Sequence, residues 1–167
     1  IALKFNIPIV DDRQMLLASE VEVVGCSAVN SEKIDIIELC EQYGKHIMLT
    51  KPAVINRTGF DRLNKIIERG RIQVGMLLQE RIGPAEVTLR RLLNEGQLGT
   101  VVSITTRKPH RLSAETRPPW FFDKEKNGGI IVDLSIHEFD LIRWMTGSEI
   151  TRIQAFMSKH ILPEHPT

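Results

Sequence analysis

The sequence is poor in cysteine and contains no long apolar run, and each absence excludes a class of protein. Its two cysteines, Cys26 and Cys40, are too few for a disulfide framework and lie in apolar segments, which favours a reducing compartment. No segment approaches the roughly 18 to 20 apolar residues of a membrane-spanning helix. Residues 1–8 also lack the apolar stretch of a signal peptide. We therefore expect a soluble, cytoplasmic protein without a membrane partner.

The sequence also lacks an excess of charge of either sign. Twenty-two lysines and arginines face 21 aspartates and glutamates, for a net charge of +1. Nucleic acids and acidic membranes attract proteins through a broad basic field, which this balance does not provide. Since 42% of the 167 residues are hydrophobic, the chain can bury a sizeable core. The expected partner is a small molecule rather than a nucleic acid.

Short apolar segments alternate with amphipathic ones from Ile7 to Glu80. The pattern β, α, β, α, β, α, β begins near Ile7 and predicts strands over 21–27, 46–50 and 72–78, and helices over 31–43 and 58–69. Such alternation builds a parallel sheet covered by helices, with right-handed crossovers. We therefore predict an α/β fold in which residues 1–80 form the C-terminal part of a doubly wound parallel sheet.

The pattern changes after Glu80, which predicts a second domain over residues 81–167. Its predicted elements are a helix over 84–95, a strand over 101–106, a long loop over 110–126, a helix over 130–145 and a strand over 150–157. The loop is rich in proline and arginine around Trp120. Long loops are often functional, so Trp120 is a candidate substrate contact, although an aromatic side chain in a loop can equally anchor the loop to its domain.

The predicted helix over 130–145 carries the residues most suited to chemistry. Asp133, His137 and Asp140 are spaced i, i+4 and i+7 behind the pair Gly128-Gly129, so they share one helix face. Apolar residues on the other faces indicate a buried helix, in which a carboxylate and an imidazole need hydrogen-bond partners. A substrate pocket would supply them. A structural Asp–His pair and a metal site remain alternatives, but no third metal ligand is evident and we expect no metal.

A lysine follows the strand predicted over 46–50. Lys51 lies at the carboxyl end of this strand, the edge of an open α/β sheet where ligands bind, and Pro52 favours an extended Lys51. A solvated surface lysine is the alternative.

Three motifs in chain order resemble the Gfo/Idh/MocA family of glucose-fructose oxidoreductases and inositol dehydrogenases. The resemblance covers nearly the whole chain. The motifs are Gly44-Lys45-His46 through Thr50-Lys51-Pro52, Arg81 with the turn Gly96-Gln97-Leu98-Gly99, and Gly128-Gly129 followed by Asp133, His137 and Asp140.

This resemblance implies a partial NAD(P)-binding Rossmann domain over 1–80 and a partial α+β domain over 81–167. The second domain would contain an open, mostly antiparallel sheet that often makes a homo-oligomer interface, in a dimer or tetramer. The cofactor would be NAD or NADP, and the substrate a sugar or polyol.

The resemblance also implies roles for individual residues. Lys51 and His137 would face the nicotinamide and the reacting hydroxyl, and Asp133 would order the substrate or the histidine. Ser27, Asn30, Lys51, Pro52 and Arg81 would contact the cofactor. We expect neutral His137 to take the hydroxyl proton as a general base and Lys51 to stabilise the developing oxyanion. Alternatives within the family are NAD-dependent glycoside hydrolysis and a non-catalytic sugar or dinucleotide sensor.

The sequence departs from the family pattern at three places. Thr50 stands where the family usually has Glu, and Lys33 stands where it usually has His, a position that we interpret as peripheral. No G-x-G-x-x-G follows a predicted strand, and no acidic residue lies about 20 residues beyond one. Because the chain also begins with Ile1, we expect it to be a piece of a longer fold. This piece does not contain the residues that choose between NAD and NADP.

Overall fold

The structure is a computed structural model that describes residues 2–158. Within this range no helix is both long and apolar enough to cross a membrane. The α-helices are α1 (Ala2–Phe5), α2 (Asp12–Leu17), α3 (Lys33–Gln42), α4 (Arg57–Arg69), α5 (Pro84–Asn94), α6 (Lys124–Asn127), α7 (Ile130–Asp133) and α8 (Ile136–Thr146). The strands are β1 (Val23–Cys26), β2 (His46–Thr50) and β3 (Val74–Leu77), and the 3-10 helices are η1 (Gln79–Ile82), η2 (Ala114–Thr116) and η3 (Pro119–Phe122).

The strands form one parallel sheet in the order β1-β2-β3. Val23 pairs with His46, and Ile47 pairs with Val74. Each strand is joined to the next by a helix, which is the crossover that a parallel pair requires. The α/β fold and its parallel sheet are therefore confirmed, whereas assignment to a doubly wound Rossmann sheet stays a prediction.

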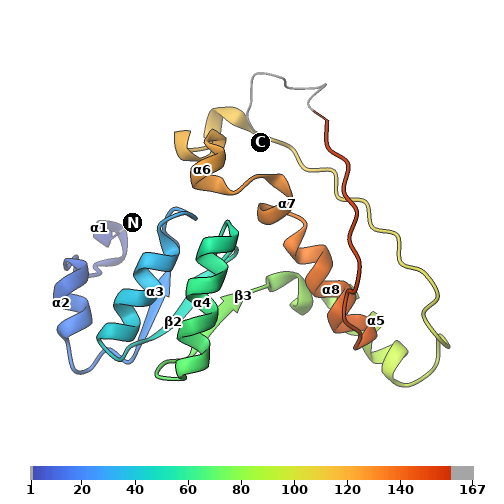
Figure 1. Ribbon diagram of the computed structural model, residues 1–167, viewed down its shortest axis with the longest axis horizontal. Coiled ribbons are helices and arrows are strands. Elements are labelled where there is room, and N and C mark those ends of the chain that lie inside the picture. The colour runs from blue at the N-terminus through green and yellow to red at the C-terminus, as the bar shows by residue number, and fades with distance from the viewer. Residues whose placement is uncertain (1, 159–167) are drawn as a thin grey trace.

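Helices α3 and α4 cover one face of the sheet (Figure 1). The core on this face is formed by Ile34, Ile37 and Cys40 of α3, Leu63 and Ile66 of α4, and Val24, Cys26, Ile47 and Leu49 of the strands. Alternate strand residues point to the opposite face, where Val23 is 58% and Met48 is 42% exposed. Among the described residues the sheet is thus buried on one side. Cys40 of α3 lies in this core, and its burial raises the pKa of its thiol to about 11.

Local signals determine where α4 begins and ends. The Asn56 side chain accepts a hydrogen bond from the Gly59 backbone N–H at 2.8 Å, which caps the first turn. Gly70 ends the helix in the left-handed conformation, as predicted. The side chain of Arg62 then ties α4 to Asp35 and Glu38 of α3. These two helices therefore form one layer over the sheet.

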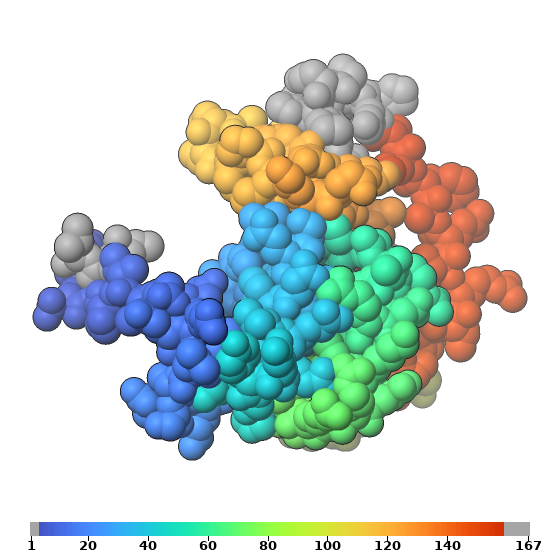
Figure 2. All heavy atoms as spheres, turned by 60° about the vertical axis from the view of Figure 1, so that its left-hand side comes forward, coloured from blue at the N-terminus to red at the C-terminus, as the bar shows by residue number. Residues whose placement is uncertain are grey.

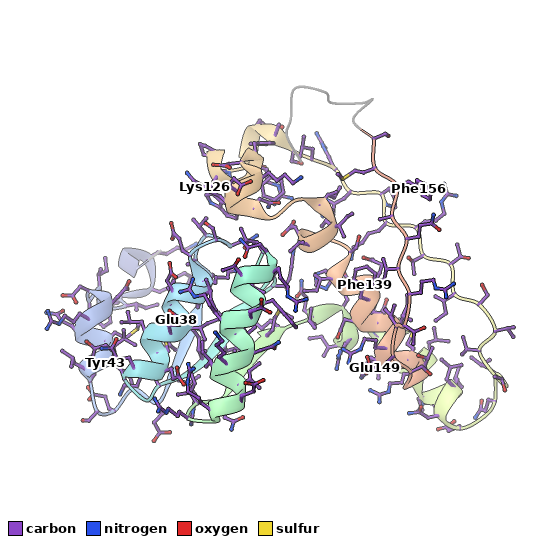
Figure 3. The ribbon with its side chains drawn as sticks, in the orientation of Figure 1. Glu38, Tyr43, Lys126, Phe139, Glu149 and Phe156 are labelled. Atoms are coloured by element: carbon purple, nitrogen blue, oxygen red, sulfur yellow. The ribbon has the colours of Figure 1, made fainter. Side chains whose placement is uncertain are left out.

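Three predicted strands are not formed. The segments near Ile7, over 101–106 and over 150–157 contain no strand in the described part of the chain. Phe156 lies on the last of these segments (Figure 3) and is 89% exposed. A strand needs a neighbour for its backbone hydrogen bonds, and none of these segments pairs with another between residues 2 and 158. The predicted mostly antiparallel sheet is accordingly not observed, and residues 159–167 of the predicted second domain lie outside the described residues.

The helix predicted over 130–145 is broken in two. α7 ends at Asp133 and α8 begins at Ile136, with Leu134 and Ser135 between them. The His137 backbone N–H donates to the Leu134 carbonyl, one residue short of the α-helical spacing. Asp133 and His137 consequently lie on separate helices rather than on one continuous face.

Adjacent isoleucines on α4 offer a test of the one-sided core. Ile66 is fully buried, whereas Ile67 is 56% exposed. We expect Ile66→Ala to lower the free energy of unfolding by about 2–5 kcal/mol, because it leaves a cavity in the core between α4 and the sheet. The matched change Ile67→Ala should lower it by less than about 1 kcal/mol. Urea denaturation of both variants measures the difference, and equal losses would show that the core does not lie here.

Candidate functional site

The predicted site residues gather at the carboxyl edge of the sheet. Ser27 follows β1, Lys51 follows β2, and Glu80 and Arg81 follow β3. Because the strands are parallel, these three ends lie at one edge. The segment with α6 and α7 lies above the same edge (Figure 1), and its orange atoms rest on the light-blue start of α3 (Figure 2).

Lys51 and Asp133 form an ion pair between these two parts of the chain. The Lys51 ammonium donates to the Asp133 carboxylate at 2.8 Å and to the Asp133 carbonyl at 2.5 Å. The two side chains are 20% and 12% exposed. Of the three ammonium hydrogens, two are therefore directed at Asp133 and one is left for another acceptor. The structure brings these two predicted residues together, although the sequence pattern suggested His137 as the neighbour of Asp133.

His137 lies beside a different carboxylate. Its side chain is 4% exposed, and its Nδ1 atom has no hydrogen-bond partner among the described residues. The nearest carboxylate oxygen belongs to Glu80 and is 4.0 Å from Nδ1. Lys108 donates to this Glu80 carboxylate and also pairs with Glu138 at 3.2 Å. Glu80 and Lys108 thus form a charged group next to the imidazole.

Burial lowers the pKa of His137 below its ordinary value of about 6.5. The Glu80 and Glu138 carboxylates oppose this shift, and the Lys108 and Lys51 ammonium groups add to it. Hydrogen bonds to Glu80 and Glu138 raise the pKa of Lys108 even though burial acts to lower it. At neutral pH the site therefore holds a neutral imidazole, which is the form that can accept a proton.

The Arg81 side chain is paired with another residue of the chain. Its guanidinium makes a two-point ion pair with Asp140 of α8, a residue that is 6% exposed, and this hydrogen bonding raises the pKa of Arg81. The predicted Arg81 contact to the cofactor would therefore use only the hydrogens that remain free. The third residue of the Asp-His-Asp motif serves to join α8 to η1.

The other predicted cofactor residues differ in exposure. Ser27 is exposed, whereas Pro52 is buried after a cis peptide bond from Lys51. Asn30 is 4% exposed, its amide N–H donates to the Asn127 carbonyl at 3.0 Å, and its amide oxygen accepts from Lys33. Both polar ends of the Asn30 side chain are thus used inside the protein. The assignment of these residues to cofactor binding stays a prediction.

Lys33 is not peripheral, and that interpretation is wrong. The residue is 1% exposed, and its ammonium donates to the Asn30 side chain and to the backbone carbonyls of Thr50, Lys51 and Pro52 at 2.9–3.2 Å. Because lysine is rarely buried, its residue type alone predicts that Lys33 lies at the surface. Here the ammonium replaces water with four oxygen atoms of the protein.

The turn before α7 requires its glycines. Gly128 has φ of +91°, and a Cβ atom on it would lie 2.8 Å from the Ile55 Cβ atom. The Gly129 backbone N–H donates to the buried Asn127 side chain at 3.0 Å. The segment that follows Lys51 and Pro52 therefore lies close against the backbone of Gly128.

Trp120 lies in η3 within an aromatic cluster. Its ring meets Phe121 edge-on with centroids 6.1 Å apart, and Phe121 meets Phe122 in the same manner. Arg117 stacks 4.5 Å from the Phe121 centroid. These contacts all lie within the loop itself, so the choice between a loop anchor and a substrate contact for Trp120 stays a prediction.

A cavity of about 590 Å³ lies away from the site. It is lined by residues of α5, α8 and the segment 99–104, none of them a predicted site residue. Between residues 2 and 158, no group of three or more His, Cys, Asp or Glu side chains is placed to hold a metal ion.

Sequence reasoning missed Lys33, Glu80, Lys108 and Asn127. Glu80 could have been found, because it follows a predicted strand as directly as Arg81 does. Asn127 precedes the Gly128-Gly129 pair, where a side chain often satisfies the backbone of a turn. Lys108 carries no such signal, because an extended segment brings it to Glu80 from 28 residues away.

Comparison with known proteins identifies a group of similar sequences. Residues 87–166 match the family model described as the GFO/IDH/MocA C-terminal domain. The chain is 26% identical over 140 residues to inositol 2-dehydrogenase of Rhizobium meliloti, covering 83% of this chain and 40% of that protein. It is 33% identical over 125 residues to scyllo-inositol 2-dehydrogenase (NAD(+)) of Bacillus subtilis, covering 71% and 33%.

A solved structure shares the fold. A crystal structure of a putative oxidoreductase from Erwinia carotovora atroseptica superposes with a TM-score of 0.80 at 22% identity, and the match covers 87% of this chain and 46% of that one. The chain thus spans about two fifths of the length of the curated relatives it matches.

Gly128→Ala should destabilise the chain. The added methyl group meets Ile55 and also has an unfavourable positive φ. Gly147 is a matched control, because its φ is +65° but nothing lies within 4 Å of an added Cβ. We expect Gly147→Ala to cost about 1 kcal/mol for the backbone alone, and Gly128→Ala to cost about 1–3 kcal/mol more for the clash. Denaturant unfolding measures both, and equal costs would contradict the close approach.

The carboxylate of Glu80 should hold the pKa of His137 higher than burial alone would allow. Glu80→Gln removes this carboxylate, so we expect the pKa of His137 to fall further. Titration of the imidazole ring signals by NMR measures the shift, with Glu149→Gln as a control because Glu149 pairs with Arg143 instead. An unchanged or higher pKa would contradict the arrangement.

The lowered pKa of His137 also fixes the sign of its effect on stability. In the unfolded chain His137 binds a proton at a higher pH than it does in the folded chain. The contribution of neutral His137 to the free energy of unfolding is therefore complete above about pH 6.5. It is lost as the pH falls from there through the lowered pKa of the folded state.

Proposed function

The chain belongs to the Gfo/Idh/MocA family, and from that premise we propose that it is the substrate-facing part of an NAD(P)-dependent dehydrogenase acting on a sugar or polyol. The proposed reaction removes a proton from a hydroxyl and a hydride from its carbon. Dehydrogenases of inositols are among the relatives, and one of them is named for NAD(+). The choice between NAD and NADP stays open in this proposal.

One observation carries the proposal. Lys51 and His137 come from opposite parts of the chain, 86 positions apart in the numbering, yet both lie at the carboxyl edge of the sheet with their charged neighbours Asp133 and Glu80. A purely structural ion pair would account for Lys51 and Asp133. It would not account for His137, a nearly buried imidazole with a lowered pKa that lies beside Glu80 at the same edge.

The residues at the sheet edge fit the nicotinamide half of a dinucleotide site. Lys51 and His137 could face the nicotinamide end, and Ser27 lies exposed after β1 at the same edge. The chain contains no Gly-rich turn for the pyrophosphate. The bound nicotinamide would supply the acceptor for the hydride, and the residues of this chain would handle the proton and the oxygen.

The proton would pass to His137. In this proposal the imidazole carries its proton on Nδ1, 4.0 Å from the Glu80 carboxylate, and the Nε2 lone pair accepts the hydroxyl proton. The lowered pKa keeps the imidazole neutral before this step. The imidazolium that forms would be stabilised by the Glu80 carboxylate rather than by Asp133.

Lys51 would bind the oxygen that loses its proton. Asp133 takes up two ammonium hydrogens through its carboxylate and its carbonyl, so the third hydrogen has a fixed direction. A donor held in this way stabilises developing negative charge without reorganising. In this proposal Asp133 orients Lys51, a different task from the one that the sequence pattern suggested.

The proposal includes a division of the chain at residues 80 and 81. The family model for the C-terminal domain begins at residue 87, which supports a boundary in this region. Assembly as a homo-oligomer and a cytoplasmic location remain proposals that rest on the family resemblance.

Replacement of either proposed reacting residue should strongly reduce turnover. We expect Lys51→Met and His137→Gln each to lower kcat/KM by about 100-fold or more. The first removes the donor to the oxyanion, and the second removes the proton acceptor. The assay follows NADH or NADPH formation with a panel of inositols and aldoses. It uses a protein in which the 167 residues follow a complete dinucleotide-binding segment, either naturally or by fusion to that segment of a relative.

Matched controls separate this effect from a general loss of charge. Lys65 lies exposed on α4, and His110 lies exposed in the extended segment after η1 and α5. Lys65→Met and His110→Gln should retain turnover near that of the parent. Near-normal turnover in either Lys51→Met or His137→Gln would overturn the assignment, and release of free sugar from a glycoside without net NADH would replace dehydrogenation by hydrolysis.

A further inference from the structure

We propose that Lys33 is a positioning residue that holds both members of the Lys51–Asp133 pair in place through its buried ammonium group. This inference rests on the proposed role of Lys51 in binding the substrate oxygen. It concerns a residue that departs from the family pattern, since Lys33 stands where the family usually has histidine.

One set of hydrogen bonds fixes the backbone around Lys51. The Lys33 ammonium donates to the carbonyl oxygens of Thr50 at 2.9 Å, of Lys51 at 3.2 Å and of Pro52 at 3.2 Å. These carbonyls belong to three consecutive residues, so the ammonium binds the turn from which the Lys51 side chain projects. A group that is bound on both sides of its Cα atom has little freedom to change direction.

A second set of hydrogen bonds leads from Lys33 to Asp133. The ammonium also donates to the Asn30 amide oxygen at 3.0 Å, and the Asn30 amide N–H donates to the Asn127 carbonyl. The Asn127 side chain accepts from the Gly129 backbone N–H, and the Gly129 carbonyl accepts from the Asp133 backbone N–H at 2.9 Å. This connected network ends at the residue that binds Lys51.

Burial shows why this ammonium is a positioning group. Its removal from water lowers the pKa of Lys33, which records a cost that an apolar side chain would not carry. At 1% exposure Lys33 cannot touch a substrate, so it can influence the site only through Lys51 and Asp133. A methionine of similar length would remove the cost but leave four oxygen atoms without their donor.

The test compares Lys33→Met with the parent chain by NMR of lysine ammonium groups in the 167-residue protein. We expect a resolved signal for the Lys51 ammonium, identified by its loss in Lys51→Met, and slow hydrogen exchange with water. In Lys33→Met this exchange should become at least ten-fold faster. Lys45→Met is the matched control, because Lys45 also donates to a backbone carbonyl, that of Ala18, but away from the site. It should leave the Lys51 signal unchanged.

Two outcomes would overturn the proposal. If Lys33→Met lowers the free energy of unfolding but leaves the exchange of the Lys51 ammonium as in the parent, Lys33 has only a structural role. If Lys33→Met does not fold, Asn30→Ser decides, because it removes the amide that links Lys33 to Asn127 but leaves Lys33 bonded to the backbone carbonyls of residues 50–52. Unchanged exchange of both the Gly129 amide and the Lys51 ammonium in Asn30→Ser would also overturn it, whereas faster exchange of both would support it.

These measurements do not depend on turnover. A protein that fails the dehydrogenase assay but shows the expected change in Lys33→Met would refute the proposed function and retain the positioning role. The opposite result would retain the function and refute the role of Lys33.

Discussion

The contact between Lys51 and Asp133 holds the two parts of the chain together at the site. It joins residues that are 82 positions apart, and the contacts around it are also polar or involve glycine. Asn30 reaches Asn127, the Ser31 backbone reaches Lys126, and Ile55 packs on Gly128. Apolar cores tolerate exchange of one side chain for another of similar volume, whereas hydrogen bonds require defined directions. Such a junction favours accurate placement over large stabilisation.

The position of each charge follows from a choice between partners. The sequence pattern allowed Asp133 to pair with His137 and Arg81 to remain free. In the fold, Asp133 instead meets Lys51 after β2, and Arg81 after β3 meets Asp140. Lys51 takes Asp133, Arg81 takes Asp140, and Lys108 takes Glu80 and Glu138. His137 is left as the buried group whose Nδ1 atom has no partner in the described part of the chain. In the proposed function, this neutral imidazole is the group that accepts the hydroxyl proton.

Much of this arrangement could be predicted because it depends on local signals. The alternation of segments placed β2 correctly and put Lys51 at its carboxyl end, and Gly70 ended α4 where expected. What could not be predicted depends on distant partners. The break after Asp133 follows from tertiary contacts that override helix periodicity, and the segments 101–106 and 150–157 have strand-like sequences without strands to pair with. Lys33 was misplaced because residue type predicts exposure and only the fold reveals its oxygen ligands.

The three-stranded sheet has a further consequence for how this fold can grow. Along the outer sides of β1 and β3, backbone N–H and C=O groups have no strand beside them among residues 2–158. Such edges are templates onto which another strand can be added. Growth in that direction runs across the strands, whereas the polar residues collect at the strand ends. An added strand would therefore extend the sheet at right angles to the direction in which the site residues lie.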